Sequence, residues 1–454
     1  MSPRTARLLL FFGCTAYAVL YAVLSLLRFR SFHGQIDLSY YIRIVWGLAH
    51  GQLDVPLVQA PHLIGLHLEP ILLPFAVLAR LGLPIAPLLL VGQAVAVALL
   101  PLPVYRLSRR RLGSDGWAPL LALGSLLYPT VTVATLHDFH PVTVALPLLA
   151  AWLDAIDEGS WRRALGFGAL ALACREDIAL QLALPVLALW WRHPQWRARL
   201  VTVAGLLLLY FGVYIVVIQP HFLPKLGSYG LHFASTGTNV SSGRELLFLL
   251  LRQPLRFVAA WLTWDRLRYV IELLWPLGFL PLLGGRLAVG ALPILAINFL
   301  SSFPRVRSIE SHYTTAMVPF LVMAAVVGLS QVRDLLRMRS RRELGLPLFA
   351  GLMLLLSGSH LLHGGSPLAI ASSRYSAAQF GDEAEAEALR TAIAAVPAGA
   401  AVAARPGPLA HLADRPRVIS PPEYDDGQPV EVVLTPDAAP STEARIGNQK
   451  VTPH

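Results

Sequence analysis

Charged residues and cysteines are both scarce in this chain, and each scarcity excludes a class of protein. Only 14% of the 454 residues are charged, whereas a soluble domain carries about 25%. The two cysteines, Cys14 and Cys174, both lie in apolar runs. They cannot form a disulfide framework or a zinc-binding cysteine motif. Lysine occurs only at positions 225 and 450, so nearly all of the positive charge comes from arginine.

Several motifs that mark common activities are also absent. The sequence has no P-loop, no Gly-x-Gly-x-x-Gly dinucleotide fingerprint and no Gly-x-Ser-x-Gly elbow. ATP-driven transport and serine hydrolysis therefore lack support. The net charge of +10 does not indicate a nucleic-acid partner, because the excess arginines cluster in short loops between apolar runs.

Apolar sequence is what the chain has in quantity. Hydrophobic residues make up 55% of the chain and its mean hydropathy is +0.57. Many apolar runs approach the roughly 20 residues that a helix needs to cross the bilayer core. Arginine clusters such as 106–111 and 333–342 interrupt them at alternate gaps. Because arginine-rich short loops stay cytoplasmic, the sequence predicts an all-α polytopic membrane protein with its N-terminus in the cytoplasm and its C-terminus outside.

About eleven transmembrane helices are expected. The first run ends without the small-residue cleavage site of a signal peptide, so we expect it to be retained. The stretch 70–79 is too short to cross and is expected to lie in the outer leaflet. The crossings are expected at 8–27, 84–104, 117–136, 142–156, two short helices within 164–191, 200–218, 269–283, 287–303, 313–332 and 344–361.

The composition changes after residue 363 and predicts three parts. Residues 1–363 are expected to form the transmembrane domain, with outer loops at 28–69, 137–141, 219–269 and 304–312. Residues 364–435 have a helical run and short β-like runs, which predict a small α/β appendage on the outer face. Residues 436–454 are rich in Pro, Ala, Ser and Thr, a composition that predicts a disordered tail.

Titratable side chains gather in the first outer loop and in the turn at 137–141. Asp37, His67 and Glu69 offer a general base or a cation ligand. The alternative is an interfacial helix with a solvated acidic face. His137, Asp138 and His140 could hold a divalent metal or face a phosphate, or they could merely cap two helix ends.

Arg175-Glu176-Asp177 interrupts an apolar stretch, where charge is costly unless it faces a cavity or a partner. An ordinary outer loop between two short helices would also account for it. In the late outer loop, Arg305, His312 and Tyr313 suit an anionic ligand. Anionic lipid headgroups are an equal alternative for these residues.

The chain resembles a family of uncharacterised bacterial polytopic membrane proteins that is grouped with the GT-C glycosyltransferases. The resemblance covers roughly residues 10–420. It is carried by Asp37-Leu38, Trp46 to Gly51, His67 to Leu72, Leu102 to Leu107, Tyr128-Pro129, Asp138-Phe139-His140-Pro141, Arg175-Glu176-Asp177, His312-Tyr313 and Ala410 to Arg415.

The resemblance implies a GT-C-like fold and transfer of a sugar from a polyprenyl-phosphate carrier at the outer face of the bacterial plasma membrane. It places one acidic residue after the first span, where Asp37 lies, and another between spans 3 and 4, where Asp138 lies. A clean Asp-x-Asp pair is missing. His67, His137 and His140 would therefore have to replace carboxylate ligands, and the cofactor is left open, with a divalent metal as one candidate.

Our main hypothesis is a membrane glycosyltransferase in which Asp37 is the base. Asp138 with His140 would contact a metal or the acceptor, and Glu176 and Asp177 would orient these groups or bind the acceptor. Residues expected at the donor phosphate or elsewhere in the substrate site are Arg175, Arg305, His312, Tyr313, His67 and Glu69. The rivals are a transporter or lipid flippase with Arg175-Glu176-Asp177 in a broken helix, and a scaffold that has lost activity.

Overall fold

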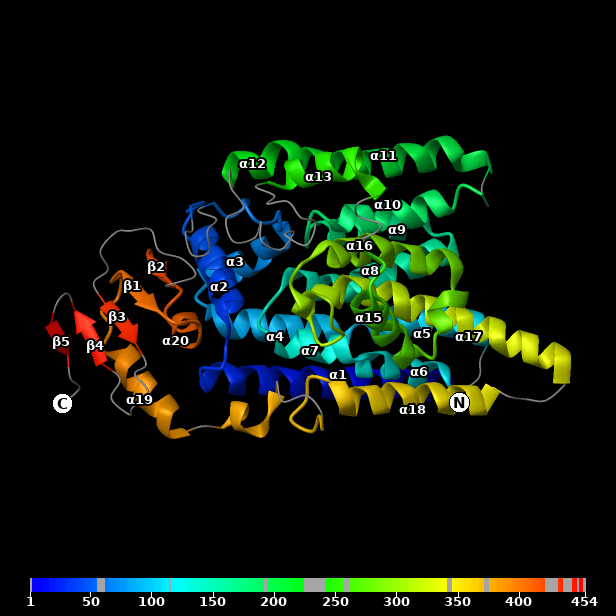
Figure 1. Cartoon of the computed structure of the whole chain (residues 1–454). Coiled ribbons are helices and arrows are strands. Elements are labelled where there is room, and N and C mark those ends of the chain that lie inside the picture. The colour runs from blue at the N-terminus through cyan, green and yellow to red at the C-terminus, as the bar shows by residue number, and fades with distance from the viewer. Residues whose placement is uncertain are drawn as a thin grey trace.

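The computed structural model is mostly helical, with a small sheet at one end (Figure 1). It describes residues 2–54, 62–113, 116–191, 194–223, 242–255, 261–340, 345–370, 375–381, 383–420, 432–435, 443–446 and 449–451. The α-helices are α1 (Pro3–Arg30), α2 (Ile36–Ala49), α3 (Leu73–Arg80), α4 (Ile85–Ala98), α5 (Pro101–Leu112), α6 (Ala118–Gly124), α7 (Pro129–Leu136), α8 (Pro141–Glu158), α9 (Trp161–Leu172), α10 (Ile178–Ala188), α11 (Arg197–Val213), α12 (Gln219–Phe222), α13 (Gly243–Arg252), α15 (Trp264–Leu274), α16 (Leu292–Leu300), α17 (Val318–Ser340), α18 (Gly345–His363), α19 (Glu383–Ala394) and α20 (Pro406–Ala410).

Five helical segments among the described residues are long and apolar enough to cross a membrane. A sixth candidate is a helix pair, Ala118–Leu127 and Pro129–Leu136, that is bent by 53°. The proline at the break has no backbone N–H to continue the helix. The five segments are Pro3–Arg30, Ile85–Leu112, Pro194–Phe222, His312–Met338 and Leu346–His363. The structure thus supports a multi-pass protein, while the expected eleven crossings are not shown.

One expected span, 269–283, is not a single straight helix in the structure. Helix α15 ends at Leu274, and Gly278 and Phe279 follow with φ values of +58° and +56°. This left-handed conformation turns the chain and ends any straight crossing. The turn then packs tightly on α17, where a Cβ atom at Gly328 would lie 2.2 Å from the carbonyl oxygen of Leu280.

Helix α2 lies within 28–69, where an outer loop was expected. Leu38, Ile42 and Val45 recur at helical spacing and are all buried, because α2 packs against α3, α4 and α20. Its aromatic and polar residues had obscured this periodicity. The stretch after it forms the short helix α3, which agrees with the non-crossing segment expected at 70–79.

The C-terminal appendage contains a five-stranded sheet with the order β2-β1-β3-β4-β5. The strands β1 (Val402–Ala404), β2 (Val418–Ile419) and β3 (Val432–Thr435) fall on the three predicted β-like runs, and their pairings are parallel. The antiparallel strands β4 (Glu443–Ile446) and β5 (Gln449–Val451) extend the sheet. These two strands lie in the tail that was predicted to be disordered. Backbone hydrogen bonds of successive hairpins pair this polar segment without needing an apolar run.

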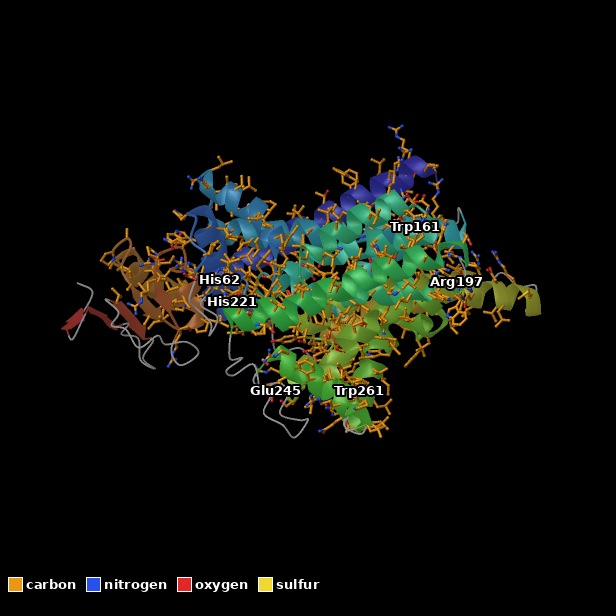
Figure 2. The ribbon with its side chains drawn as sticks, turned by 90° about the horizontal axis from the view of Figure 1, so that it is seen from above. His62, Trp161, Arg197, His221, Glu245 and Trp261 are labelled. Carbon is orange, nitrogen blue, oxygen red and sulfur yellow. The ribbon has the colours of Figure 1, made fainter. Side chains whose placement is uncertain are left out.

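Connections that were predicted to share the outer side meet one another. The ring of His62 stacks on Phe222 at 4.1 Å, and Figure 2 shows His62 beside His221, the residue before Phe222. Farther along, His363 Nδ1 lies 2.7 Å from a carboxylate oxygen of Glu310. The first residues of α1 and the strand β5 lie at opposite ends of the molecule (Figure 1). Which end faces the cytoplasm stays a prediction.

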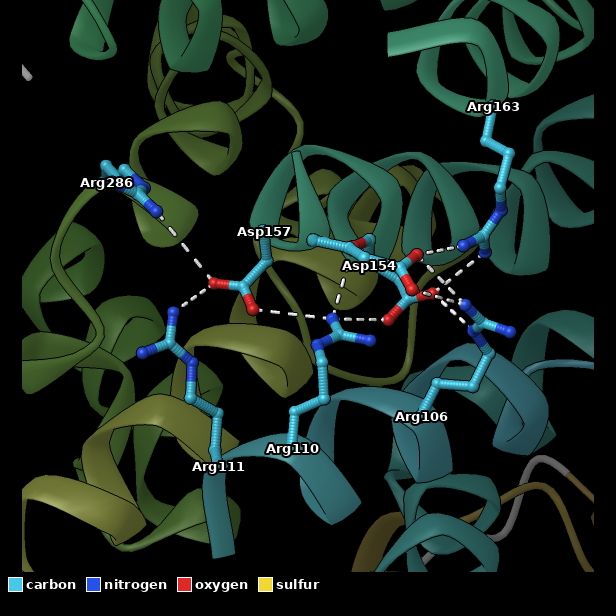
Figure 3. A network of polar contacts seen from close by, with 8 residues as sticks. Arg106, Arg110, Arg111, Asp154, Asp157, Arg163 and Arg286 are labelled. Atoms are coloured by element: carbon cyan, nitrogen blue, oxygen red, sulfur yellow. Dashed lines mark hydrogen bonds and ion pairs between the residues drawn. The ribbon is translucent and has the colours of Figure 1, made fainter. Parts of the chain in front are cut away.

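The arginine-rich connections that were predicted to be cytoplasmic also meet, in the network of Figure 3. Its centre is the fully buried Asp154 and the nearby Asp157 on α8. Each carboxylate pairs with three guanidinium groups, two from α5 and the third from another segment. The partners are Arg106, Arg110 and Arg163 for Asp154, and Arg110, Arg111 and Arg286 for Asp157. These contacts are consistent with the predicted sorting of loops into two groups, which stays a prediction, and several of the arginines are paired internally.

Candidate functional site

Helix α2 carries Asp37 into the molecule, and Asp138 holds the start of that helix. The Asp138 carboxylate accepts hydrogen bonds from the backbone N–H of Gln35 at 2.9 Å and of Leu38 at 3.0 Å. Helix N-termini leave such N–H groups unpaired, and a carboxylate there satisfies them. Asp138 itself has a φ of +39°, a conformation that Asp tolerates better than most residues. Asp138 thus holds in place the start of the helix that bears Asp37, and its own carboxylate is not part of the group around Asp37.

A second positioning residue, Gln93 on α4, was missed by the sequence analysis. Its side-chain amide is fully buried and donates to the carbonyl oxygen of Asp138 at 2.6 Å. Its amide oxygen accepts from the backbone N–H of His140 at 2.9 Å. One side chain therefore ties both ends of the turn that follows α7. The signal in the sequence was an amide in the middle of the apolar run 84–104.

Asp37 and three histidines form what we term the imidazole cluster: Asp37, His137, His140 and His312. The ring centroid of His312 lies 4.7 Å from that of His137 and 4.2 Å from that of His140. Asp37 Oδ2 lies 3.8 Å from His137 Nε2 and 3.4 Å from His140 Nε2. His137 and His140 are buried, whereas 37% of the Asp37 side chain is exposed. The cluster is therefore accessible at its carboxylate.

The first outer connection and the turn between α9 and α10 form a second group, the acidic cluster: Tyr41, His67, Glu69 and Glu176. His67 Nδ1 lies 2.9 Å from Glu176 Oε1, and the backbone N–H of Leu68 donates to the other oxygen at 2.9 Å. The Tyr41 hydroxyl donates to Glu69 at 3.1 Å. The Glu176 carboxylate therefore orients the His67 imidazole.

The surroundings shift the pKa values of His67 and Glu69 in the first outer connection. Burial raises the pKa of Glu69 to about 7, although the nearby His67 acts against this. Burial lowers the pKa of His67, but the charge of Glu176 and its hydrogen bond outweigh this, so the pKa of His67 is raised above its ordinary value. The Glu69 carboxyl, with its pKa of about 7, thus titrates closer to neutral pH than an exposed carboxylate would, as an acid–base catalyst requires.

Arg175 and Asp177 pair with each other rather than with the residues above. Two parallel hydrogen bonds of 2.7 and 2.6 Å join the guanidinium to the carboxylate. The triplet occupies the turn between α9 and α10. Adjacent residues point in different directions there, so Glu176 reaches His67 while its neighbours form a separate ion pair.

Two tyrosines, Tyr41 of the acidic cluster and Tyr313, connect the acidic cluster with the imidazole cluster. Tyr41 follows Asp37 by one turn of α2, so the two share a face of the helix. The Tyr41 ring lies edge-on at 5.8 Å from that of His140, while its hydroxyl contacts Glu69. Tyr313 packs on His312 at 4.1 Å and interacts electrostatically with both Asp37 and Arg175. The two clusters thus form one site.

Most of the predicted site residues are therefore brought together, and two are placed differently. Arg305 is exposed in a short 3-10 helix, Pro304–Val306, and the described residues show no contact between it and either cluster. Asp138 lies beneath the site as a helix cap. The metal set predicted from the sequence was His137, His140 and Asp138. The ligand atoms that converge belong instead to Asp37, His137, His140 and His312, all within 4.8 Å of one another.

Comparison with known proteins supports the fold and the family. The chain is similar to the crystal structure of ArnT from Cupriavidus metallidurans bound to undecaprenyl phosphate. The TM-score is 0.50 and the identity 15%, over 89% of this chain and 86% of that chain. At this identity the likeness concerns the fold alone, and it agrees with the expected grouping with the GT-C superfamily. No curated protein matches. The family model described as "Predicted membrane protein (DUF2079)" matches residues 28–448, so the chain belongs to this membrane protein family.

Proposed function

We propose that the protein is a GT-C-type membrane glycosyltransferase that uses a polyprenyl-phosphate-linked sugar at the extracytoplasmic face. The observation that carries this proposal is the convergence of Asp37, the histidine turn after α7 and the acidic cluster. Three connections that were predicted to be outer loops supply these residues. The fold shared with a protein bound to undecaprenyl phosphate supports the choice of a lipid-linked donor.

Asp37 is the proposed general base. Its carboxylate is partly exposed while the neighbouring imidazoles are buried, so an acceptor hydroxyl reaches the carboxylate first. Asp37 takes the hydroxyl proton as the acceptor oxygen bonds to the anomeric carbon of the sugar. The bond from that carbon to the phosphate oxygen breaks, and the phosphate leaves with the electron pair. Proton transfer of this kind contributes about 10²–10⁴-fold to a rate.

The remaining residues would serve substrate binding. Glu176 orients His67, and His312 and Tyr313 lie beside Asp37, where they would contact the donor. Arg305 is exposed and would bind the departing phosphate. Arg175 is already paired with Asp177, so its guanidinium would reach a phosphate only by exchanging that partner.

The contacts of the Arg175-Glu176-Asp177 triplet favour the enzyme over a transporter. A transporter of the expected type would place the triplet in an unwound helix that lines a substrate path. In the structure Glu176 pairs with His67, next to Glu69, and Arg175 pairs with Asp177. Glu176 thus belongs to the same group of residues as the first outer connection, while its two neighbours form an ion pair of their own.

The test is the turnover of purified protein in detergent with a panel of polyprenyl-phosphate sugars. We expect Asp37→Asn to lower turnover by about 10²–10⁴-fold while the thermal midpoint stays near that of the unmodified protein. Asp54→Asn is the matched control, because Asp54 is exposed in the same connection. Equal turnover for Asp37→Asn and Asp54→Asn would remove Asp37 from the mechanism.

A further inference from the structure

The spacing within the imidazole cluster is unlike that of ordinary ion pairs. Asp37 Oδ2 lies 3.4 and 3.8 Å from the Nε2 atoms of His140 and His137. A charge-assisted N–H···O hydrogen bond is shorter, at about 2.7–2.9 Å. Two ligands bound tetrahedrally at about 2.0–2.1 Å from one ion lie about 3.4 Å apart. The cluster therefore has the spacing of ligands around an ion.

The types of donor atom select the ion. Three imidazole nitrogens and one carboxylate oxygen make up the set. Imidazole suits zinc and other late first-row metals, whereas Mg²⁺ and Ca²⁺ are bound almost entirely by oxygen. Neutral imidazoles with one carboxylate would carry a charge of about −1, which a divalent cation more than balances. Zn²⁺ also suits a set of four ligands, because its filled d shell imposes no geometry and its structural sites in proteins are almost always tetrahedral.

The scaffold holds these donors before any ion arrives. The turn that bears His140 is tied by the fully buried Gln93 through two hydrogen bonds, and α2 is fixed at its start by Asp138. His312 opens a 3-10 helix whose first turn is capped by Ser311, which accepts from the N–H of Tyr313 at 3.3 Å. Such supporting contacts orient metal ligands and raise affinity.

One buried atom of the cluster has no partner. His140 Nδ1 is buried and accepts or donates no hydrogen bond in the structure. A buried polar nitrogen without a partner costs about 1–3 kcal/mol, so such atoms are uncommon unless a water or an ion completes the site. Nδ1 lies on the other side of the ring from the Nε2 atom that faces Asp37, so this atom is a separate feature, and the ion site rests on the spacing and the types of the donor atoms.

We propose that Asp37, His137, His140 and His312 bind one Zn²⁺ ion in a tetrahedral site. Binding itself does not depend on the glycosyltransferase proposal, whereas the use of the ion there rests on it. The structure turns Asp37 Oδ2 towards the imidazoles, so the second carboxylate oxygen is left for the acceptor hydroxyl. Asp37 then serves as a ligand through one oxygen and as the base through the other.

The experiment measures the metal content and Zn²⁺ affinity of the full chain in detergent, after chelator treatment and dialysis against Zn²⁺ or Mg²⁺. We expect about one Zn²⁺ per chain, and tetrahedral absorption bands when Co²⁺ replaces it. His140→Ala and His312→Ala should each weaken Zn²⁺ binding more than about 100-fold. His50→Ala is the matched control, since His50 stacks on Trp46 outside the cluster and its loss should leave binding unchanged.

Asp37→Asn keeps the shape of the side chain and guards against a folding artefact, because it should weaken binding while the apo thermal midpoint stays constant. Zinc retained equally by the His140→Ala, His312→Ala and His50→Ala variants would overturn the proposal, as would equal retention of Mg²⁺ and Zn²⁺. Zinc binding by a protein without transferase activity would leave the metal site standing and count against the proposed function. Transfer that proceeds fully in a chelated protein lacking Zn²⁺ would overturn the use of the ion in catalysis and would leave the binding site standing.

Discussion

We expect the stability of the protein to fall between about pH 5 and about pH 8 because of one buried carboxyl group, Glu69, and we expect Glu69→Gln to reduce this fall. Only 7% of Glu69 is exposed. Burial raises its pKa from 4.5 to about 7, with Glu176 adding to the rise and His67, Arg175 and the Tyr41 hydroxyl opposing it.

The size and the sign of the effect follow from proton linkage. In the pH window between these two values the folded protein keeps a proton that the unfolded chain has released. Stability is therefore fully present below the unfolded value and is lost as the pH rises through the folded one. A unit of pKa corresponds to about 1.4 kcal/mol, so a rise from 4.5 to about 7 amounts to on the order of 3 kcal/mol.

The assay is the thermal midpoint of the protein in detergent across this pH range. Glutamine keeps the hydrogen bond from Tyr41 but has no proton to release. The thermal midpoint of the variant should therefore rise relative to that of the unmodified protein as the pH increases. The raised pKa of His67 also makes stability fall as the pH rises. The thermal midpoint of the variant should therefore still fall with pH, but by less. Glu387→Gln is the control, because 71% of that side chain is exposed. Parallel curves for Glu69→Gln and the unmodified protein would refute the argument.

Two further predictions concern the frame of the site and its side of the membrane. Gln93→Leu should lower the thermal midpoint and loosen the His140 turn, because it leaves buried backbone groups unpaired at about 1–3 kcal/mol each; Gln52→Leu, at an exposed position, is the control, and equal midpoints for the two would contradict the role of Gln93. A cysteine introduced by Ser441→Cys should react with an impermeant thiol reagent on intact cells, and labelling only after lysis would show that the orientation is reversed.

The sequence predicted the membrane class and the residue types of the site, because those depend on composition and local spacing. His137 and His140 were found together since they are neighbours in the chain. That His312 joins them could not be predicted, because its approach depends on how the 3-10 helix His312–Met317 packs against α8 and α7. The role of Asp138 could not be predicted either, since an acidic residue in a turn reads the same whether it binds an ion or caps another helix.

The count of eleven crossings stays a prediction for a different reason. Apolar length predicts burial in either lipid or protein, and several apolar runs here are short helices packed within the bundle, such as α10 and Gly285–Leu300. Gln93 illustrates the converse. A single amide in an apolar run signals a buried hydrogen-bonding site, but the groups it bonds are more than forty residues away.

The arginine network on α8 has a consequence for how the chain is made. Arg106 precedes its partner Asp154 by 48 residues, so during synthesis the α5 arginines emerge well before α8 exists. In that interval they carry unpaired charge, which is the state that retains a loop on the cytoplasmic side. When α8 arrives, the same guanidinium groups close on Asp154 and Asp157. Under the orientation predicted from the arginines, the loop is retained while these charges are unpaired and the later pairing stabilises that arrangement, so the order of translation would be part of the folding route.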